Sequence, residues 1–183
     1  MTQWISAQEI PKLISPGMYV FVSGGVLEPV ALLSALQAAP QASKGVTYIA
    51  GPVAGLSKID YAGFHPEART LSAFISSEMR DSFAAGKIDF IPLQYHQRYF
   101  WIRDQAKIDV ALVQYGPPDS EGMCSPGYGV DFVPAVLDKA GIVIAEINDR
   151  LPSPPNLPKT HISKFHYAVR SSMPPQLLPI API

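Results

Sequence analysis

A glycine turn near the amino terminus contains the first residues of this sequence that could do chemistry. Ser-Gly-Gly-Val-Leu-Glu-Pro, residues 23–29, lies between an apolar run and a helix-like stretch. Glycines at such a junction let a ligand approach the backbone closely, and the free N–H groups at a helix start attract phosphate or a developing oxyanion. We therefore take Gly24, Gly25 and Glu28 as candidate binding residues. The turn lacks the glycine spacing and the lysine of nucleotide-binding loops, and a purely structural bend stays open as the alternative.

A second candidate loop, residues 116–131, is rich in glycine and proline and follows the apolar run Val110–Val113. In open α/β sheets, ligands bind outside the carboxyl ends of the strands, where this loop is expected. The candidate binding residues in it are Pro118, Asp119, Gly122, Ser125 and Gly127. For Asp119 we favour a structural role, because an aspartate after proline commonly accepts backbone N–H bonds and braces its own loop. The loop as a whole could also be no more than a connection.

Other reactive side chains carry weaker signals. Glu146 ends an apolar run, a position suited to catalysis but equally to bracing a loop, which we favour. Cys124 is the one cysteine, and a lone cysteine beside a glycine-rich loop could be a nucleophile. No histidine is near it in sequence, so we favour a non-catalytic role. A lone cysteine forms no internal disulfide, which fits a reducing cytosol. The histidines lack the spacing of metal ligands, so we expect no metal site. They are His65, His96, His161 and His166.

Alternating apolar and amphipathic segments predict the elements that position these loops. The expected strands are Met18–Val22, Val46–Ile49, Leu71–Ile75, Ile88–Leu93, Val110–Val113 and Ile142–Ile147. The expected helices are Pro29–Ala39, Ser77–Gly86 and Val133–Ala140, with a short helix from the capping box at Ser6 to Ile14. Tyr95–Ala106 is expected to be an aromatic-rich helix or an irregular cover. This alternation predicts an α/β fold, an open and mostly parallel sheet flanked by helices on both faces.

A long ordered pattern runs from Asp109 to Pro152 and resembles the acetyl-CoA hydrolase/transferase family, which includes 4-hydroxybutyrate and succinate CoA-transferases. The family pattern is D-V-A-L-(I/V)-Q-x-S-P-P-D-x-x-G-x-C-S-L-G-V-S-V-D, followed by I-A-E-V-N-D-x-M-P. The residues in register are Asp109–Gln114, Pro117–Asp119, Gly122, Cys124–Ser125, Gly127, Val130–Asp131, Ala145–Glu146, Asn148–Asp149 and Pro152. Gly116, Pro126 and Leu151 replace the usual Ser, Leu and Met.

The resemblance extends toward both ends of the chain. Residues 86–92, Gly-Lys-Ile-Asp-Phe-Ile-Pro, are similar to the family's G-x-x-D-(Y/F)-I-P, and Met18–Leu36 is similar to its opening strand, glycine turn and helix. Two departures affect acyl-group specificity more than the fold. Gln94–Gln97 stands where the family has an S-E-I-P-like stretch, and His161–His166 stands where it has H-V-S-D-I-D.

The resemblance implies a CoA-transferase-like, Rossmann-like three-layer fold and a covalent reaction. In the family a glutamate attacks an acyl-CoA thioester, and the acyl-glutamyl anhydride becomes a glutamyl-CoA thioester that a carboxylic acid or water resolves. That glutamate belongs to a second half, which is absent here. The glutamates that could substitute for it, none in the family's nucleophile motif, are Glu28, Glu78, Glu121 and Glu146. We therefore expect no catalytic residue in this chain, which contributes its glycine-rich loops to an active site completed elsewhere.

The alternative is a non-catalytic module that uses the same fold to bind a small anion or to assemble. Under the favoured interpretation the partners are acyl-CoA and carboxylate substrates and a carboxy-terminal half, in cis or in trans. No bound cofactor is expected, coenzyme A thioester being the substrate. We also expect an oligomer. The aromatic residues of Tyr95–Trp101 and the proline-rich tail are candidates for an apolar face that meets the second half.

Length and composition set the remaining expectations. The 183 residues carry a net charge of −1, and 48% are hydrophobic. This balance favours neither nucleic acid nor an anionic membrane as a partner, and the start resembles no signal peptide. A cytoplasmic location is expected. We assign residues 1–150 to a CoA-transferase amino-terminal α/β domain and residues 151–183, where prolines gather, to an arm or interdomain linker.

Overall fold

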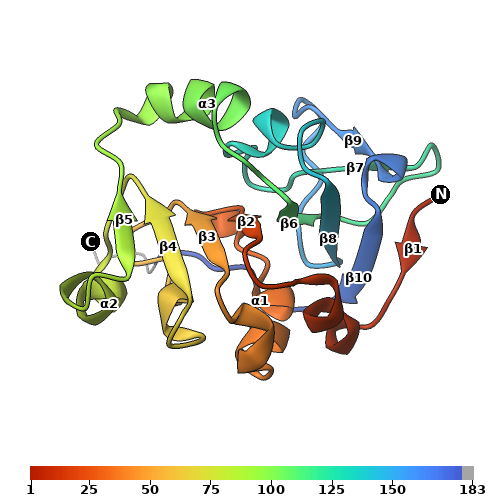
Figure 1. Ribbon diagram of the computed structural model, residues 1–183. Helices are drawn as coiled ribbons and strands as arrows, with labels where there is room; N and C mark the ends of the chain where they lie inside the picture. The colour runs from red at the N-terminus through yellow and green to blue at the C-terminus, as the bar shows by residue number, and fades with distance from the viewer. Residues whose placement is uncertain (179–183) are drawn as a thin grey trace.

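The computed structural model describes residues 1–178 and is built on one eight-stranded parallel sheet (Figure 1). The strand order is β1-β10-β8-β6-β2-β3-β4-β5, and every neighbouring pair is parallel. The strands are β1 (Gln3–Trp4), β2 (Tyr19–Val22), β3 (Thr47–Ala50), β4 (Arg69–Ser72), β5 (Ile88–Phe90), β6 (Val110–Tyr115), β8 (Ile142–Asn148) and β10 (Tyr167–Ser171). The predicted α/β fold with a mostly parallel sheet is confirmed.

The central strands are apolar because both of their faces are covered. Every residue of β6 is buried, as is every residue of β8 except Ile142. Parallel strands covered on both faces have near-continuous apolar sequences, which explains why these two runs were recognisable. Alternate side chains of one strand point to opposite faces of the sheet and pack into different apolar clusters. Phe21 lies in one apolar cluster, and its neighbours Val20 and Val22 lie in the other.

Helices cover the two faces. Helix α1 (Val30–Gln37) packs Leu32, Leu33 and Leu36 into the cluster on one face. Helix α3 (Tyr95–Asp104) packs Ile102 into the cluster on the other face, and Figure 1 shows these two helices on opposite sides of the sheet. The short helix α2 (Arg80–Ala84) precedes β5. The 3₁₀ helices are Ala7–Leu13, Gly25–Leu27, Pro40–Ser43, Tyr61–Gly63, Ser77–Met79, Val133–Ala135 and Ile162–Lys164.

Most expected elements are present, with shifted ends. The capping box at Ser6 is formed with Glu9, but the helix that follows is 3₁₀. Strand β4 begins and ends earlier than the expected Leu71–Ile75. The helix expected at Val133–Ala140 is wrong, since only Val133–Ala135 is helical and it is 3₁₀. Along residues 133–140, some N–H groups bond to the carbonyl three residues earlier and others to the carbonyl four residues earlier. This mixture gives tight irregular turns instead of an α-helix.

Part of the expected arm adds strands to the fold. Strand β10 pairs with β8 and β1 within the main sheet, and β9 (Thr160–His161) pairs with β7 (Met123–Cys124) in a small antiparallel sheet. The boundary expected at residue 150 stays a prediction. The last part of the expected arm, residues 179–183, lies outside the described residues.

Candidate functional site

A cavity of about 480 Å³ opens at the carboxyl edge of the sheet, beyond the ends of β2, β3 and β4. Its lining is mostly apolar, with two charged side chains. The lining residues are Gly24, Gly25, Val26, Leu27, Gly51, Pro52, Val53, Ala54, Leu56, Phe74, Tyr95, Arg98, Gly129, Asp131 and Phe132. Chain connections proceed from β2 toward β5 on one side and from β6 toward β10 on the other. The cavity thus lies beside the point where strand order reverses, the usual ligand position in such folds.

Two glycine turns from neighbouring strands meet at this cavity. A side-chain carbon added at Gly24 would lie 2.6 Å from the carbonyl oxygen of Gly51, so these two backbones touch. Gly25 has φ of 59°, a left-handed conformation that side chains rarely adopt. Gly24 and Gly25, both predicted from sequence, therefore lie where a ligand would meet bare backbone. The N–H groups of Gly25 and Val26 donate no hydrogen bond to any residue from 1 to 178.

Asp131 brings the second loop to the cavity. It is the one non-glycine residue with positive φ, 44°, in the described part of the chain. Its Oδ2 accepts a hydrogen bond of 3.0 Å from the N–H of Gly24, which joins the loop to the glycine turn. Burial raises the pKa of this carboxyl, and the Gly24 N–H and the Arg98 charge oppose that effect.

Arg98 is the second charged group of the lining. It lies on α3, is only 3% exposed, and its guanidinium carbon is 4.8 Å from the centre of the Phe132 ring. Burial lowers its pKa, an effect that the charge of Asp131 opposes. Arg98, Asp131 and Tyr95 line the cavity but were not predicted as site residues from the sequence. The available signal for Arg98 was its place directly after Gln94–Gln97, where the chain departs from the family pattern.

Glu28 is buried near the glycine turn without being part of the lining. Its Oε1 accepts a hydrogen bond from the hydroxyl of Tyr61, and its Oε2 accepts one of 2.9 Å from Gln176 Nε2. Its backbone carbonyl accepts a third, of 2.8 Å, from Gln114 Nε2. Burial raises the pKa of the carboxyl, and the bonds from Tyr61 and Gln176 oppose that effect. These contacts give Glu28 a bracing role between distant segments.

The other glutamates also lie off the cavity lining. Glu146 is fully buried, and its Oε2 accepts a hydrogen bond of 2.8 Å from the N–H of Ala31 at the start of α1. It thus braces a helix start where we expected it to brace a loop. Its Oε1 has no hydrogen-bond partner within residues 1–178, and burial raises its pKa. Glu78 pairs with Lys58 at 3.9 Å, and Glu121 lies exposed in the second loop.

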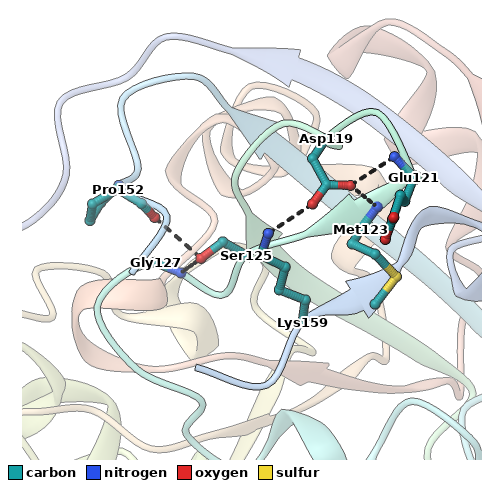
Figure 2. Close-up of polar contacts among 7 residues, drawn as sticks. All are labelled: Asp119, Glu121, Met123, Ser125, Gly127, Pro152 and Lys159. Atoms are coloured by element: carbon teal, nitrogen blue, oxygen red, sulfur yellow. Dashed lines mark hydrogen bonds and ion pairs between the residues drawn. The ribbon is translucent and has the colours of Figure 1, made fainter. Parts of the chain in front are cut away.

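None of the five candidate binding residues predicted in the second loop lines the cavity. They are Pro118, Asp119, Gly122, Ser125 and Gly127. Figure 2 shows Asp119 at the centre of a set of hydrogen bonds. Its Oδ1 accepts from the N–H groups of Glu121 at 3.1 Å and Met123 at 2.9 Å, and its Oδ2 pairs with Lys159 at 2.7 Å. The bond from Lys159 lowers the pKa of Asp119. The predicted bracing role of Asp119 is confirmed, and its place in substrate binding stays a prediction.

The remaining members of that group also make structural contacts. Ser125 Oγ accepts from Gly127 N at 3.1 Å and donates to the Pro152 carbonyl at 3.3 Å (Figure 2). Gly122 and Gly127 both have positive φ, and a side-chain carbon at Gly122 would lie 2.8 Å from His161 Nε2. Pro118 borders a separate cavity of about 350 Å³ beside Trp4 and Arg170.

Cys124 is expected to be unreactive in the folded protein. It is fully buried, and burial raises the pKa of its thiol to about 11. Because the thiolate is the nucleophile, iodoacetamide at neutral pH should modify Cys124 slowly in the native state and rapidly after unfolding in guanidinium. Mass spectrometry of the two samples measures the difference. Equal rates would contradict the packing role.

Comparison with known proteins assigns the family. Residues 1–169 match the acetyl-CoA hydrolase/transferase N-terminal domain. The chain belongs to this family. The 4-hydroxybutyrate coenzyme A transferase of Clostridium kluyveri is 27% identical over 171 residues, which cover 93% of this chain and 40% of the relative. The succinyl-CoA:acetate/propanoyl-CoA:succinate CoA transferase of Fasciola hepatica is 27% identical over 180 residues, which cover 94% of this chain and 36% of the relative.

Solved structures support the fold of this family member. RipA from Yersinia pestis superposes with a TM-score of 0.85 at 20% identity, covering 99% of this chain and 45% of RipA. The 4-hydroxybutyrate CoA-transferase from Porphyromonas gingivalis gives a TM-score of 0.68 at 21% identity, covering 94% of this chain and 40% of that one. This family member thus spans less than half the length of the relatives it matches.

Two features are absent from residues 1–178. No helix is long and apolar enough to span a bilayer. No cluster of three or more His, Cys, Asp or Glu side chains is arranged to hold a metal ion.

Proposed function

We propose that this chain is the substrate-binding amino-terminal half of an acyl-CoA hydrolase or CoA-transferase. The observation that carries the proposal is the cavity at the carboxyl edge of the sheet, in which Gly24 and Gly25 present bare backbone. Membership of the acetyl-CoA hydrolase/transferase family supports a thioester as its ligand. The substrates would be an acyl-CoA and a carboxylic acid or water, and the cell compartment would be the cytoplasm.

The glycine turn would serve the reaction by hydrogen bonding. The N–H groups of Gly25 and Val26 have no partner between residues 1 and 178. Donors held in this way stabilise the oxygen of a thioester carbonyl as it gains charge during attack. The attacking carboxylate would be a glutamate of a carboxy-terminal half, forming an acyl-glutamyl anhydride and releasing coenzyme A thiolate. Return of the thiolate to the anhydride would release the acid and leave a glutamyl-CoA thioester.

The mouth of the cavity supports a second half as a covering partner. Phe74 and Tyr95 line the cavity, are 37% and 63% exposed, and have ring centres 6.2 Å apart. Val53 also lines the cavity and is 42% exposed, and Leu178, 56% exposed, lies against the neighbouring Gly55. Apolar groups gathered at a cavity mouth are typical of a surface that meets another protein part. We propose that the carboxy-terminal half covers this mouth and completes the active site.

Covalent trapping tests the division of labour between the halves. The chain alone is expected to show no thioester exchange, and exchange should appear when a carboxy-terminal half of the family is added. Borohydride reduction during turnover should then modify a glutamate of the added half, and peptide mass spectrometry would locate it. A stoichiometric adduct on Glu28, Glu121 or Glu146 would make this chain a self-sufficient enzyme. Ligand binding without exchange, whichever half is added, would favour a non-catalytic binding module.

A further inference from the structure

The guanidinium of Arg98 is buried at the cavity without a polar partner. Arg98 is 3% exposed, yet its side chain donates no hydrogen bond and makes no ion pair within residues 1–178. Its nitrogen atoms are not fully enclosed by protein, so they face open space. Arg98 lines the 480 Å³ cavity and also borders a second one of about 10 Å³. Because the second cavity is too small for a carboxylate, a ligand group could reach the guanidinium only from the first. The charge of Asp131 opposes the effect of burial only in part. A buried cation without a hydrogen-bonded partner is costly, and an anionic ligand group would reduce that cost.

Packing fixes the direction of the guanidinium. The Phe132 ring lies against the guanidinium, 4.8 Å from ring centre to guanidinium carbon. The backbone of Gly51 is so close to Nη1 that any side-chain carbon there would overlap it. Gly51 also touches Gly24 through its carbonyl oxygen. Gly51 therefore lies between the guanidinium and the glycine turn, and the two residues after Gly24 in that turn carry the proposed oxyanion donors.

The charge balance of the cavity favours a singly charged planar anion. Asp131 is the one carboxylate among the lining residues, and its Oδ2 is bonded to Gly24 N. Its nearby negative charge disfavours a doubly charged phosphate. A carboxylate matches the planar fork of arginine with two parallel hydrogen bonds. The lining of the cavity also includes the apolar side chains of Leu27, Val53 and Leu56. These would contact the methylene groups between the thioester carbonyl and the carboxylate of such a ligand.

We propose that Arg98 binds the distal carboxylate of a short dicarboxylic acyl group, so that the site prefers a dicarboxylic acyl-CoA over its monocarboxylic equivalent. This inference rests on the proposed function, because it assigns the second end of the same substrate. The reacting thioester carbonyl lies at the N–H groups of Gly25 and Val26, and the free carboxylate pairs with Arg98. Arg98 is thus a specificity-determining residue and takes no part in bond making.

Isothermal titration of the chain with succinate, with neutral succinamide as the comparison, tests the pairing directly. Succinate should bind the parent and succinamide should not. Arg98→Met should weaken succinate binding roughly 10- to 100-fold, the loss expected for a pair of charge-assisted hydrogen bonds. Arg98→Lys should retain part of the binding, since lysine offers a point charge without the fork. Arg103→Met is the matched control on the same helix, because Arg103 is exposed and pairs with Asp104.

Two results would overturn the inference. One is a parent chain that does not bind succinate, since every residue of this site belongs to the chain. The other is a lower melting temperature of Arg98→Met with unchanged succinate binding, which would make Arg98 only a counter-ion of Asp131. Neither result bears on the glycine turn, so exchange of monocarboxylic acyl groups by the joined halves would still support the proposed function. In the joined halves, Arg98→Met should lower kcat/KM for succinyl-CoA relative to butyryl-CoA about tenfold or more, and an unchanged ratio would also contradict the inference.

Discussion

When this chain is combined with a carboxy-terminal half of the family, Gly25→Val is expected to lower turnover by about 10²–10³-fold, the effect of losing one oxyanion donor. A valine side chain at Gly25 would enter the cavity, where its first carbon would lie 3.3 Å from Cγ2 of Val53. It would block the approach of a thioester carbonyl to the N–H groups of Gly25 and Val26. Steady-state kinetics with the second half supplied in trans measures the loss.

The fold should tolerate the same change. Gly25 has φ of 59°, and a β-branched residue in that conformation adds strain of about 1–3 kcal/mol. Gly86→Val is the matched control, because Gly86 has φ of 68° but a side-chain carbon there meets nothing within 4 Å. Both variants should lose a similar amount of thermal stability, and only Gly25→Val should lose turnover. Equal turnover in the two variants would show that the Gly24–Gly25 turn is only a bend in the chain.

The sheet was predictable because its strongest signals are local. The first four residues of β6, Val110–Val113, and of β8, Ile142–Ala145, are apolar without interruption, since each strand is covered on both faces. Element ends were less predictable, because they depend on contacts with distant segments. The stretch after Asp131 shows this. The composition of this stretch favours a helix. However, Asp131 has a left-handed backbone and is bonded to Gly24 across the sheet edge, so the residues that follow it form turns.

The candidate site was predictable only where backbone chemistry defines it. Gly24 and Gly25 were identifiable as candidates because glycine at a strand-to-helix junction lets a ligand approach the backbone N–H groups closely. Arg98 was not, since an arginine in an aromatic helix is usually a surface residue, and only the fold brings it to Gly51 and Phe132. The Asp119 loop carried an equally strong glycine and proline signal. That signal reflects hydrogen bonds within the loop.

Glu28 is expected to give stability effects of opposite sign for two substitutions. Glu28→Ala removes the acceptor of Tyr61 and Gln176, leaving buried donors unpaired at a cost of about 1–3 kcal/mol. Glu28→Gln keeps an oxygen acceptor in the same shape and removes the buried negative charge. At neutral pH the glutamine variant should therefore be more stable than the parent and the alanine variant less stable. Denaturant unfolding of the three proteins measures both differences.

The pH dependence follows from the direction of the pKa shift. Burial raises the pKa of Glu28 above its ordinary value of 4.5, so the folded state holds the proton more tightly than the unfolded state. The stability contributed by protonated Glu28 is fully present below the unfolded pKa and is lost as the pH rises through the folded pKa. The advantage of Glu28→Gln over the parent should consequently grow as the pH rises above the ordinary value of 4.5 and become constant once the pH has passed the folded pKa.

Comparing variants isolates Glu28 from the other buried carboxyls. Burial also raises the pKa of Asp131 and Glu146, but both remain in every protein compared, so their contributions cancel in the difference. Glu67→Gln provides the control, because that side chain is 58% exposed, and it should change stability little at any pH. A Glu28→Gln advantage that is constant with pH would mean that Glu28 is ionised equally in the folded and unfolded states. Its hydrogen bonds from Tyr61 and Gln176 would then offset the full cost of burying the charge.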